Sequence, residues 1–275
     1  MPKTPFDITL QDRELSLVLL DIIGSTAFVQ QAGRVRAAKW LQYHDRLARN
    51  LIYRFNGREI DRSDGFLLSF EQPIDALNFA LQYQKTVPQK TKLQARIGIH
   101  TGRVVEVKQD ELMVGIGAKG IELEGVAKNI AARVMSLCQE GQVLITKTTM
   151  SKIKNRTNAY TPKGTRFACV GLYKFKGVRE AYEVYAVGES IESLQPPPDS
   201  DKVKRLGGPK YIKSRARDRK VKEWIYWFFW RFAFLVGLYW VYLIGYVFIH
   251  KPSRTLFGFY GYEWIDRIVK MIQRL

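Results

Sequence analysis

The first 60 residues contain a continuous apolar run followed by a stretch with helical spacing of its apolar residues. Leu15 to Ile22 is a strongly apolar run, which is typical of a buried strand. The run ends at Gly24, Ser25 and Thr26, and a helical pattern follows from Ala27 to about Phe55. Because hydroxyl side chains are preferred at helix N-caps, Ser25 or Thr26 is expected to cap this helix.

Strands and helices alternate through the next 130 residues. Two short β patterns, Arg58 to Ile60 and Phe66 to Phe70, flank the turn residues 62–65 and predict a hairpin with an acidic tip. The later expected elements are a helix from Pro73 to about Lys85, a strand pair at 93–100 and 104–107 around Gly102, a helix from Val126 to Cys138, and strands at 143–145, 167–173 and 182–187. The order β-α-β-β-α-β indicates an α+β sandwich of the ferredoxin-like kind.

The last quarter of the chain joins a basic block to an apolar one. Ten Lys and Arg residues lie between Lys202 and Lys222, and the 19 residues from Phe232 to His250 carry no Asp, Glu, Lys or Arg. A membrane-spanning helix needs roughly 20 apolar residues and is often flanked by Trp and Tyr, as this run is. A buried helix of a soluble domain is the alternative, but it leaves the basic block without a purpose. The pattern predicts a basic juxtamembrane segment over 202–223 and a transmembrane helix over 224–250.

The regions around this anchor follow from the same pattern. The three prolines of 196–198 mark residues 189–201 as a linker. Residues 251–275 have apolar positions at helical spacing opposite basic ones, which is typical of an amphipathic interfacial tail. Met1 to Gln11 is polar and does not resemble a signal peptide. Since basic flanks stay in the cytoplasm, we expect a single-pass protein of the cell membrane with its first 200 residues in the cytoplasm.

Composition narrows the class of partner. The 275 residues are 46% hydrophobic and 25% charged, so the chain can bury a core and is not disordered throughout. The net charge of +18 suits an anionic partner, and +11 of it falls in residues 201–275, beside the apolar run. That position favours lipid headgroups over nucleic acid. Cys138 and Cys169 are too few for a disulfide scaffold or a cysteine zinc cluster, and we expect free thiols.

Two carboxylates are candidates for chemistry. Asp21 ends a buried strand before a glycine turn into a helix N-terminus, so its carboxylate lies beside free backbone N–H groups that suit a metal-bound triphosphate. Asp64 on the neighbouring hairpin supplies a second carboxylate for a pair of ions ~3.5 to 4 Å apart. Singly, Asp21 fits a helix cap and Asp64 a turn residue. Together they favour a site for hard ions such as Mg²⁺ or Mn²⁺.

A second polar pair lies on the third helix. Asn129 and Arg133 are four residues apart, so both project from one face and can address one ligand. An exposed polar pair without function is the alternative. The small and apolar residues between them favour a packed helix with a directed polar face.

Four motifs in a fixed order carry a family resemblance: LDIIGST at 20–26, SDGF at 63–66, RIGIHTG at 96–102 and NIAAR at 129–133. Together they resemble the catalytic domain of the class III nucleotidyl cyclases, over about residues 12–188. The resemblance implies conversion of a nucleoside triphosphate into a 3′,5′-cyclic monophosphate and pyrophosphate. It also implies two Mg²⁺ or Mn²⁺ ions per active site and a homodimer with its sites at the interface.

The resemblance assigns roles to positions of this chain. The metal-binding positions are Asp21, Ile22 and Asp64, and the phosphate-binding turn is Gly24, Ser25 and Thr26. By the same resemblance, Asn129 orients the ribose and Arg133 stabilises charge on the α-phosphate. Lys176 is a candidate contact to the triphosphate, with a solvated strand lysine as its alternative. In this family the aspartates come from one subunit and the Asn and Arg from its partner.

Substrate choice is where the chain departs from the family pattern. Ile60 stands where adenylyl cyclases carry a base-reading Lys, and Glu122 stands at the second base-reading position, usually Asp. Glu122 keeps an acceptor for an exocyclic amino group. Ile60 removes the hydrogen-bond donor to the purine ring, and Arg58 or Arg62 could reach the same edge of the base. ATP is the leading expectation, with GTP and the pyrimidine triphosphates open. The alternative to an enzyme is a non-catalytic nucleotide-sensing or dimerisation module, but the retained Asp, Asp, Asn and Arg set argues against it.

Overall fold

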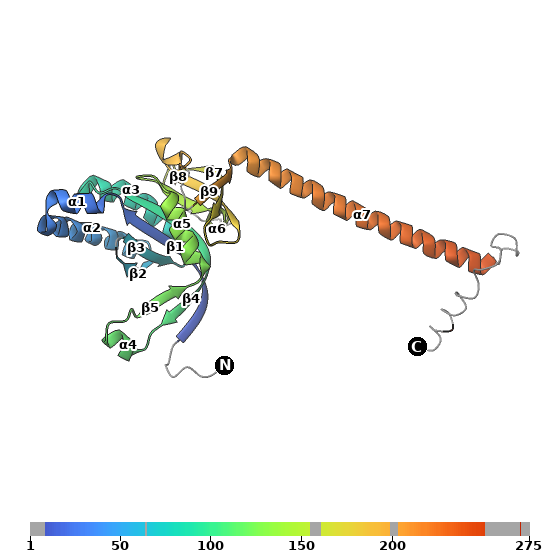
Figure 1. Cartoon of the computed structure of the whole chain (residues 1–275), viewed down its shortest axis with the longest axis horizontal. Coiled ribbons are helices and arrows are strands. Elements are labelled where there is room, and N and C mark those ends of the chain that lie inside the picture. Colours follow the sequence, from blue (N-terminus) through green and yellow to red (C-terminus); the bar gives the residue numbers. More distant parts are fainter. Residues whose placement is uncertain (1–8, 64, 155–160, 199–202, 251–269, 271–275) are drawn as a thin grey trace. The chain divides into compact units, whose positions relative to one another are not determined.

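The computed structural model describes residues 9–63, 65–154, 161–198, 203–250 and 270. The chain separates into two units, residues 1–213 and 214–275. The first unit holds all nine described strands in one sheet with the order β2-β3-β1-β4-β6-β8-β7-β9, and β5 pairs with β4 (Figure 1). The elements in chain order are β1 (Thr9–Ile22), α1 (Ser25–Ala32), α2 (Arg34–Arg54), β2 (Gly57–Arg62), β3 (Gly65–Phe70), α3 (Pro73–Thr91), β4 (Ala95–Lys108), α4 (Glu111–Gly115), β5 (Ile121–Glu124), α5 (Val126–Leu137), β6 (Val143–Thr146), α6 (Lys147–Lys154), β7 (Arg166–Phe175), β8 (Ala181–Gly188), a 3₁₀ turn (Glu192–Leu194), β9 (Val203–Gly207) and α7 (Pro209–His250).

The expected α+β architecture is confirmed. β1, α2, β2, β3, α3 and β4 form the β-α-β-β-α-β unit, with β1 antiparallel to both β3 and β4. Alternate residues of β1 face opposite layers, as the period of a strand requires. Val18, Leu20 and Ile22 pack with α2 and α3, and Leu15 and Leu17 pack with α5. The sheet is therefore covered on both faces where β1 and β4 lie.

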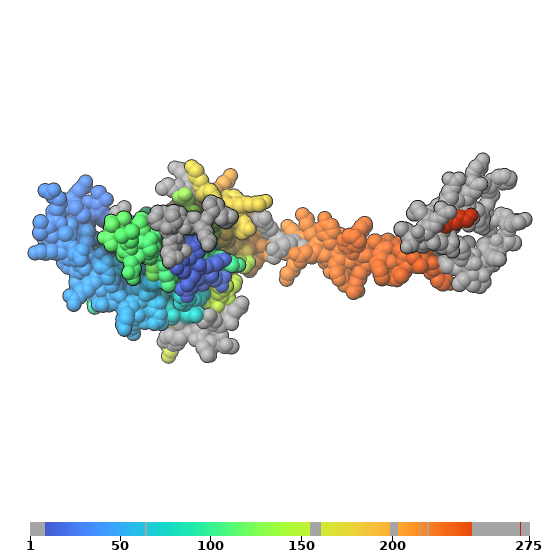
Figure 2. Space-filling view, turned by 90° about the horizontal axis from the view of Figure 1, so that it is seen from below, coloured from blue at the N-terminus to red at the C-terminus, as the bar shows by residue number. Residues whose placement is uncertain are grey.

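The helix expected from Ala27 to Phe55 is two helices. Gly33 lies between α1 and α2 with a φ of 78°, a region that favours glycine. Gly24, not a hydroxyl residue, is the N-cap of α1, with a φ of 69° and no side-chain capping bond. The expectation that Ser25 or Thr26 caps the helix is thus wrong, because both already belong to its first turn. In the space-filling view, α1 and α2 form one end of the surface of the first unit (Figure 2).

The strand pair expected around Gly102 is also wrong. β4 runs without a break for 14 residues and pairs with β1 along its whole length, from Thr9 opposite Lys108 to Ile22 opposite Ala95. Gly102 marks a close approach rather than a turn. A Cβ there would lie 3.0 Å from His100 Nε2 and 3.1 Å from Ala127 Cβ.

The sheet continues beyond the predicted strands. Leu194 packs against the core, and the Gln142 amide donates to the carbonyl oxygens of Ser193 and Gln195 at 3.2 and 2.8 Å. Residues 203–207 then form β9, which pairs antiparallel with β7. The segment interpreted as a linker and the start of the basic block is therefore attached to the first unit through these contacts. Cys138 and Cys169 are free thiols, as expected.

The helix at the end of the described chain is longer than the apolar run. α7 begins at Pro209, so the part of the basic segment from residue 209 onward belongs to the same helix as the run 224–250. By length and composition, its stretch Pro209–Leu243 is long and apolar enough to cross a membrane, and none of its apolar window is buried within the protein. Arg231 lies 4.1 Å from the centre of the Trp227 ring. Apart from Lys270, the tail 251–275 lies outside the described residues.

Candidate active site in two halves

The first half of the site is built where β1 ends. Asp21 lies opposite Gly65 of β3 on one side and opposite Arg96 of β4 on the other. A Cβ on Gly65 would lie 1.9 Å from the Leu20 carbonyl oxygen, so only glycine lets β3 approach β1 this closely. Asp64 lies outside the described residues. Its neighbour Gly65 pairs directly with Asp21, so the first residue of β3 lies beside Asp21 in the sheet.

Arg96 is a member of this half that the sequence did not predict. Its guanidinium donates twice to Asp21 Oδ2, from Nε at 2.9 Å and from Nη2 at 2.6 Å. Both side chains are partly exposed at the surface of the sheet. The two residues are 75 positions apart, and only the register of β1 against β4 brings them together. In the sequence, Arg96 is visible only as the first residue of the RIGIHTG motif, and that motif does not indicate its partner.

The turn after β1 presents backbone donors. Gly24 adopts a left-handed conformation, and no side chain caps the N-terminus of the eight-residue helix α1 that follows it. Ser25 and Thr26 are the first two residues of this helix, whose early N–H groups lack partners within a helix. Such an end favours anions. The predicted phosphate-binding turn thus lies directly after the strand that carries Asp21.

The donor set fits a hard divalent cation. The Ile22 side chain is buried in the core, so its carbonyl oxygen is the group left to face a ligand, next to the Asp21 carboxylate. Carboxylate and carbonyl oxygens suit Mg²⁺ and Mn²⁺. No three His, Cys, Asp or Glu side chains gather as a metal site among the described residues, a set that leaves out Asp64. Completion of the site therefore depends on Asp64 and on ligands that the substrate provides.

The second half of the site is built on α5. Asn129 is exposed and Arg133 is partly buried, while Ile130, Ala131 and Val134 are buried in the core. α5 lies close to β4 because Gly98 has no side chain. A Cβ on Gly98 would lie 2.2 Å from the backbone nitrogen of Met135 and 2.5 Å from its Cα. The predicted polar face of this helix is thus present and points away from the sheet.

Two other predicted residues lie around α5. Ile60 packs against the apolar cluster that contains Leu123 and Ala127, and Glu122 is the strand residue next to Leu123. Ile60 also falls at a register shift between β2 and β3, where Glu59 pairs with Leu68 and Asp61 with Leu67. Such a bulge redirects the side chains around it. Ile60 is therefore part of the packing beneath the second half, not a polar contact.

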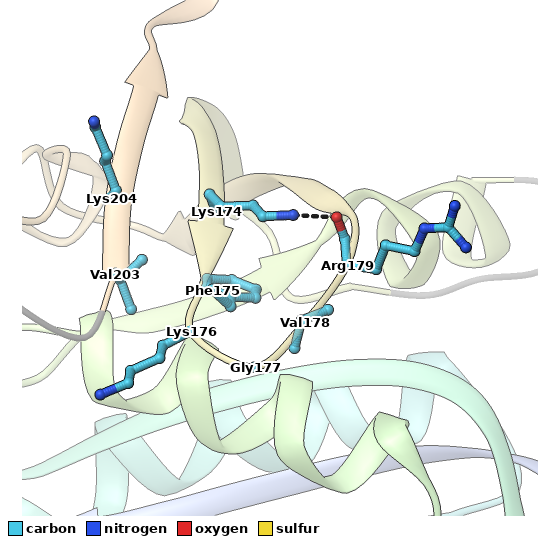
Figure 3. A pocket seen from close by; sticks show the side chains of 8 residues that line it. All are labelled: Lys174, Phe175, Lys176, Gly177, Val178, Arg179, Val203 and Lys204. Atoms are coloured by element: carbon cyan, nitrogen blue, oxygen red, sulfur yellow. Dashed lines mark hydrogen bonds between the residues drawn. The ribbon is translucent and has the colours of Figure 1, made fainter.

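Lys176 belongs to the same half through its neighbours. Phe175 and Val178 pack in one cluster with Ile130 and Val134 of α5. Lys176 is exposed and lines a surface pocket of about 530 Å³ at the turn after β7. Figure 3 shows its side chain pointing away from those of Lys174 and Arg179, with the Lys174 ammonium donating to the Arg179 carbonyl oxygen.

Arg58 and Arg62, the possible substitutes for a base-reading lysine, each form hydrogen bonds with a carboxylate of the same chain. Arg58 donates to both oxygens of Glu106, at 3.2 and 2.5 Å. Arg62 donates to both oxygens of Asp45, at 3.0 Å each. Another cation at this part of β2 is Lys119, whose ammonium lies 2.5 Å from Asp61 Oδ1. The hydrogen bond from Lys119 lowers the pKa of Asp61.

The halves do not meet within one chain. Gly98 faces Met135 at one end of α5, and Gly102 faces Ala127 at the other. Asp21 lies level with Arg96, two residues beyond Gly98. Asn129 is six residues along α5 from Met135, in the direction away from Arg96. With rises of 1.5 Å per helical residue and 3.3 Å per strand residue, Asn129 is therefore about 16 Å from the level of Asp21, measured along the strand. An Asn side chain cannot span that separation.

Comparisons with known proteins identify the family of the chain. The family model of the adenylate and guanylate cyclase catalytic domain matches residues 10–189. A receptor-type adenylate cyclase of Trypanosoma brucei brucei, ESAG 4, is 24% identical over 219 residues, covering 64% of this chain and 17% of its own. The serine/threonine-protein kinase pkn2 of Myxococcus xanthus is 24% identical over 206 residues, covering 72% of this chain and 22% of its own. The chain thus spans less than a quarter of the length of either relative.

Solved structures show the same fold. The adenylyl cyclase CyaB of P. aeruginosa superposes with a TM-score of 0.57 at 18% identity, over 68% of this chain and 99% of that one. The guanylate cyclase domain of RhGC from Catenaria anguillulae gives 0.55 at 18% identity, over 64% and 97%. An adenylate cyclase structure from Trypanosoma brucei gives 0.53 at 20%, over 75% and 98%. Because the family model covers well over half of its residues, the chain belongs to the class III adenylate and guanylate cyclase catalytic domain family.

Proposed function

We propose that the protein is a membrane-anchored homodimeric cyclase that converts ATP into 3′,5′-cyclic AMP and pyrophosphate. The observation that carries the proposal is the separation of the two halves. One chain holds Asp21 with its phosphate-binding turn at the end of β1, and Asn129 on α5 about 16 Å from the level of Asp21, which is beyond the reach of an Asn side chain. A twofold partner supplies the missing half to each site, and a closed dimer then has two equivalent sites.

The reaction needs positioning and charge stabilisation more than covalent chemistry. The 3′-hydroxyl oxygen bonds to the α-phosphorus, the bond from that phosphorus to the pyrophosphate oxygen breaks, and the hydroxyl proton leaves to solvent. Arg133 donates to the α-phosphate oxygens as their charge grows, and Asn129 holds the ribose so that its hydroxyl lies in line. A fixed guanidinium suits this task better than an ammonium would.

The triphosphate and the metal ions occupy the first half. Two Mg²⁺ or Mn²⁺ ions, typical of the family, would be held by Asp21, the Ile22 carbonyl and Asp64, and would polarise the reacting oxygens. The start of α1 binds the terminal phosphates, and Lys176 of the partner adds a positive charge. Arg96 donates to Asp21 Oδ2 and would have to release that carboxylate oxygen for a cation to bind it.

Two features of the second half bear on base choice. Glu122 presents an acceptor to the exocyclic amino group of adenine, and Ile60 offers no polar contact of its own. Matching proteins include both adenylyl and guanylyl cyclases. ATP is the substrate proposed here, and GTP and the pyrimidine triphosphates are its competitors in the assay.

The anchor is the third part of the proposal. α7 would span the membrane once with its apolar run 224–250, and the basic residues before that run would contact anionic headgroups on the cytoplasmic side. The catalytic unit would then work in the cytoplasm. Extraction of membranes with alkaline carbonate should leave the full chain in the pellet, whereas a chain ending at Lys222 should be released. Release of both would contradict the anchor.

The deciding experiment tests product and base together. The full chain, purified in detergent, is incubated with Mn²⁺ and each of the four nucleoside triphosphates, and cyclic product is measured. We expect cyclic AMP as the main product and its loss in Asp21→Ala, with thermal stability retained. Nucleotide binding without product from any triphosphate would instead favour the sensing module. Normal turnover by Asp21→Ala would contradict the metal assignment.

A further inference from the structure

A buried polar chain connects two helices to the β2–β3 hairpin. Tyr83 Oη of α3 lies 2.5 Å from His44 Nε2 of α2, and His44 Nδ1 lies 2.9 Å from Asp45 Oδ1. Asp45 accepts from Nε and Nη2 of Arg62 at the end of β2, at 3.0 Å each. His44 and Tyr83 are fully buried and Asp45 is 6% exposed. The proposed function uses none of these four residues.

Arg62 is the point where this chain reaches the hairpin tip. Its third guanidinium nitrogen, Nη1, donates to the carbonyl oxygen of Ser63, and its guanidinium carbon lies 4.8 Å from the centre of the Phe66 ring. One planar group therefore contacts residues on both sides of the turn. On the far side of the tip, Gly65 packs directly on the backbone of β1. The described neighbours of Asp64 are thus fixed from two directions.

The pairing is oriented as well as charged. Burial raises the pKa of Asp45, but the hydrogen bonds from His44 and Arg62 outweigh it and hold that pKa below its usual value. A carboxylate kept ionised in the core needs its partner, and a guanidinium fork fits it in only one orientation. Because His44 contacts the same carboxylate and is itself held by Tyr83, α2 and α3 fix the position that the carboxylate presents to Arg62.

We propose that Asp45 and Arg62 are positioning residues that hold the β2–β3 hairpin so that Asp64 can bind metal beside Asp21. The inference rests on the proposed function, because it takes Asp64 as a metal ligand. It adds a support, anchored in α2 and α3, to a hairpin whose described residues are also held by strand pairing and by the burial of Phe66. Residues that orient metal ligands in this way commonly change metal affinity when they are removed.

The chain supplies a matched control. Arg49 and Glu59 join the same helix to the same strand with the same fork, at 2.8 and 2.9 Å. This pair contacts β2 three residues further from the tip than Arg62 does and is more exposed. If attachment of α2 to β2 were all that mattered, losing either pair would have similar effects on the metal site.

The test compares Arg62→Gln with Arg49→Gln in the full chain. Mn²⁺ binding is measured without nucleotide from the EPR signal of free Mn²⁺, and the Mn²⁺ concentration for half-maximal cyclase activity is measured at saturating ATP. For Arg62→Gln we expect the Kd for Mn²⁺ and the Mn²⁺ concentration for half-maximal activity each to rise about tenfold, with a smaller change in the KM for ATP. Arg62→Lys should not restore them, since an ammonium lacks the fork. Arg49→Gln should stay within about twofold of wild type.

Two further measurements keep the test decisive. If Arg62→Gln does not fold, the double variant Asp45→Asn/Arg62→Gln removes both buried charges together and is measured in its place. Equal Mn²⁺ constants for the Arg62 variant and wild type, or equal losses in the Arg62 and Arg49 variants, would overturn the proposal. A wild-type chain without cyclase activity refutes the proposed function alone if Mn²⁺ still binds and the Arg62 variant weakens that binding.

Discussion

His100 shows how one side chain can set the pH range of a fold. Its Nδ1 lies 2.9 Å from Thr146 Oγ1, in a buried hydroxyl network that continues through Thr149 and Thr101 to Ser16. Burial lowers the pKa of His100 from 6.5 to about 4. Although it is part of the RIGIHTG motif, the ring therefore stays neutral at physiological pH and packs beside α5.

This shift predicts a loss of stability in acid. Between pH 6.5 and about 4 the unfolded chain binds a proton that folded His100 does not, so the free energy of unfolding should fall as pH falls through this window. The total loss is about 3 kcal/mol at the lower end. Urea unfolding of the full chain in detergent, followed by pulse proteolysis from pH 4 to 8, measures it. His100→Asn should flatten the curve, and identical slopes for variant and wild type would contradict the assignment.

Individual residues also show what the sequence could and could not predict. Asp21, Asn129 and Arg133 were identified because each lies in a motif whose local pattern also predicts its element. Arg96 was missed because its partner is 75 positions away and the two meet only through strand register. The contact between Asp45 and Arg62 has the same origin, since a helix and a strand must pack before the two residues become neighbours.

Elements were predicted better than their limits. The strand at 15–22 and the helix at 126–138 were found because their periods are strong. The helix expected from Ala27 to Phe55 ran through Gly33, and Gly102 was expected in the turn between two strands. Gly33 divides a helix through its backbone conformation, while Gly102 lies inside a continuous strand and makes room for a helix. A glycine alone does not reveal which of these two uses applies, because the difference depends on what packs against it.

The position of α5 depends on another glycine, Gly98. A Cβ there would lie 2.2 Å from the Met135 backbone nitrogen, and backbone cannot rotate aside, so Gly98→Ala must push α5 away from β4. We expect a loss of about 1 to 3 kcal/mol in the free energy of unfolding. Cyclase activity should fall further than this loss explains, because Asn129 and Arg133 move with the helix.

Thermal unfolding and initial cyclase rates measure the two effects of Gly98→Ala separately. Gly115→Ala is the matched control, since nothing lies within 4 Å of a Cβ at that position and its φ is not in the left-handed region. The control should behave as wild type in both measurements. Wild-type rates for Gly98→Ala would show that the distance of α5 from the sheet does not matter to the reaction.

At the scale of the whole molecule, each chain carries two incomplete halves on one sheet. The estimated separation of about 16 Å between Asn129 and the level of Asp21 means that the Asn129 side chain cannot reach Asp21 of its own chain. Under the proposed function, dimerisation, which is typical of the family, is a condition for activity. The position of Asp21 along the sheet is fixed by the register of β1 against β4, and that of α5 is fixed by its close approach to Gly98 and Gly102.

Complementation between two inactive variants follows from this arrangement. Asp21→Ala damages the first half and Arg133→Ala the second, so each homodimer has two broken sites. A heterodimer of the two concentrates both lesions in one site and leaves the other intact, and its activity should be about half that of the wild-type dimer. Coexpression with two different tags and sequential purification isolates this heterodimer for the cyclase assay. If it is as inactive as both homodimers, each chain must build its own site, and the arrangement of halves across a dimer is wrong.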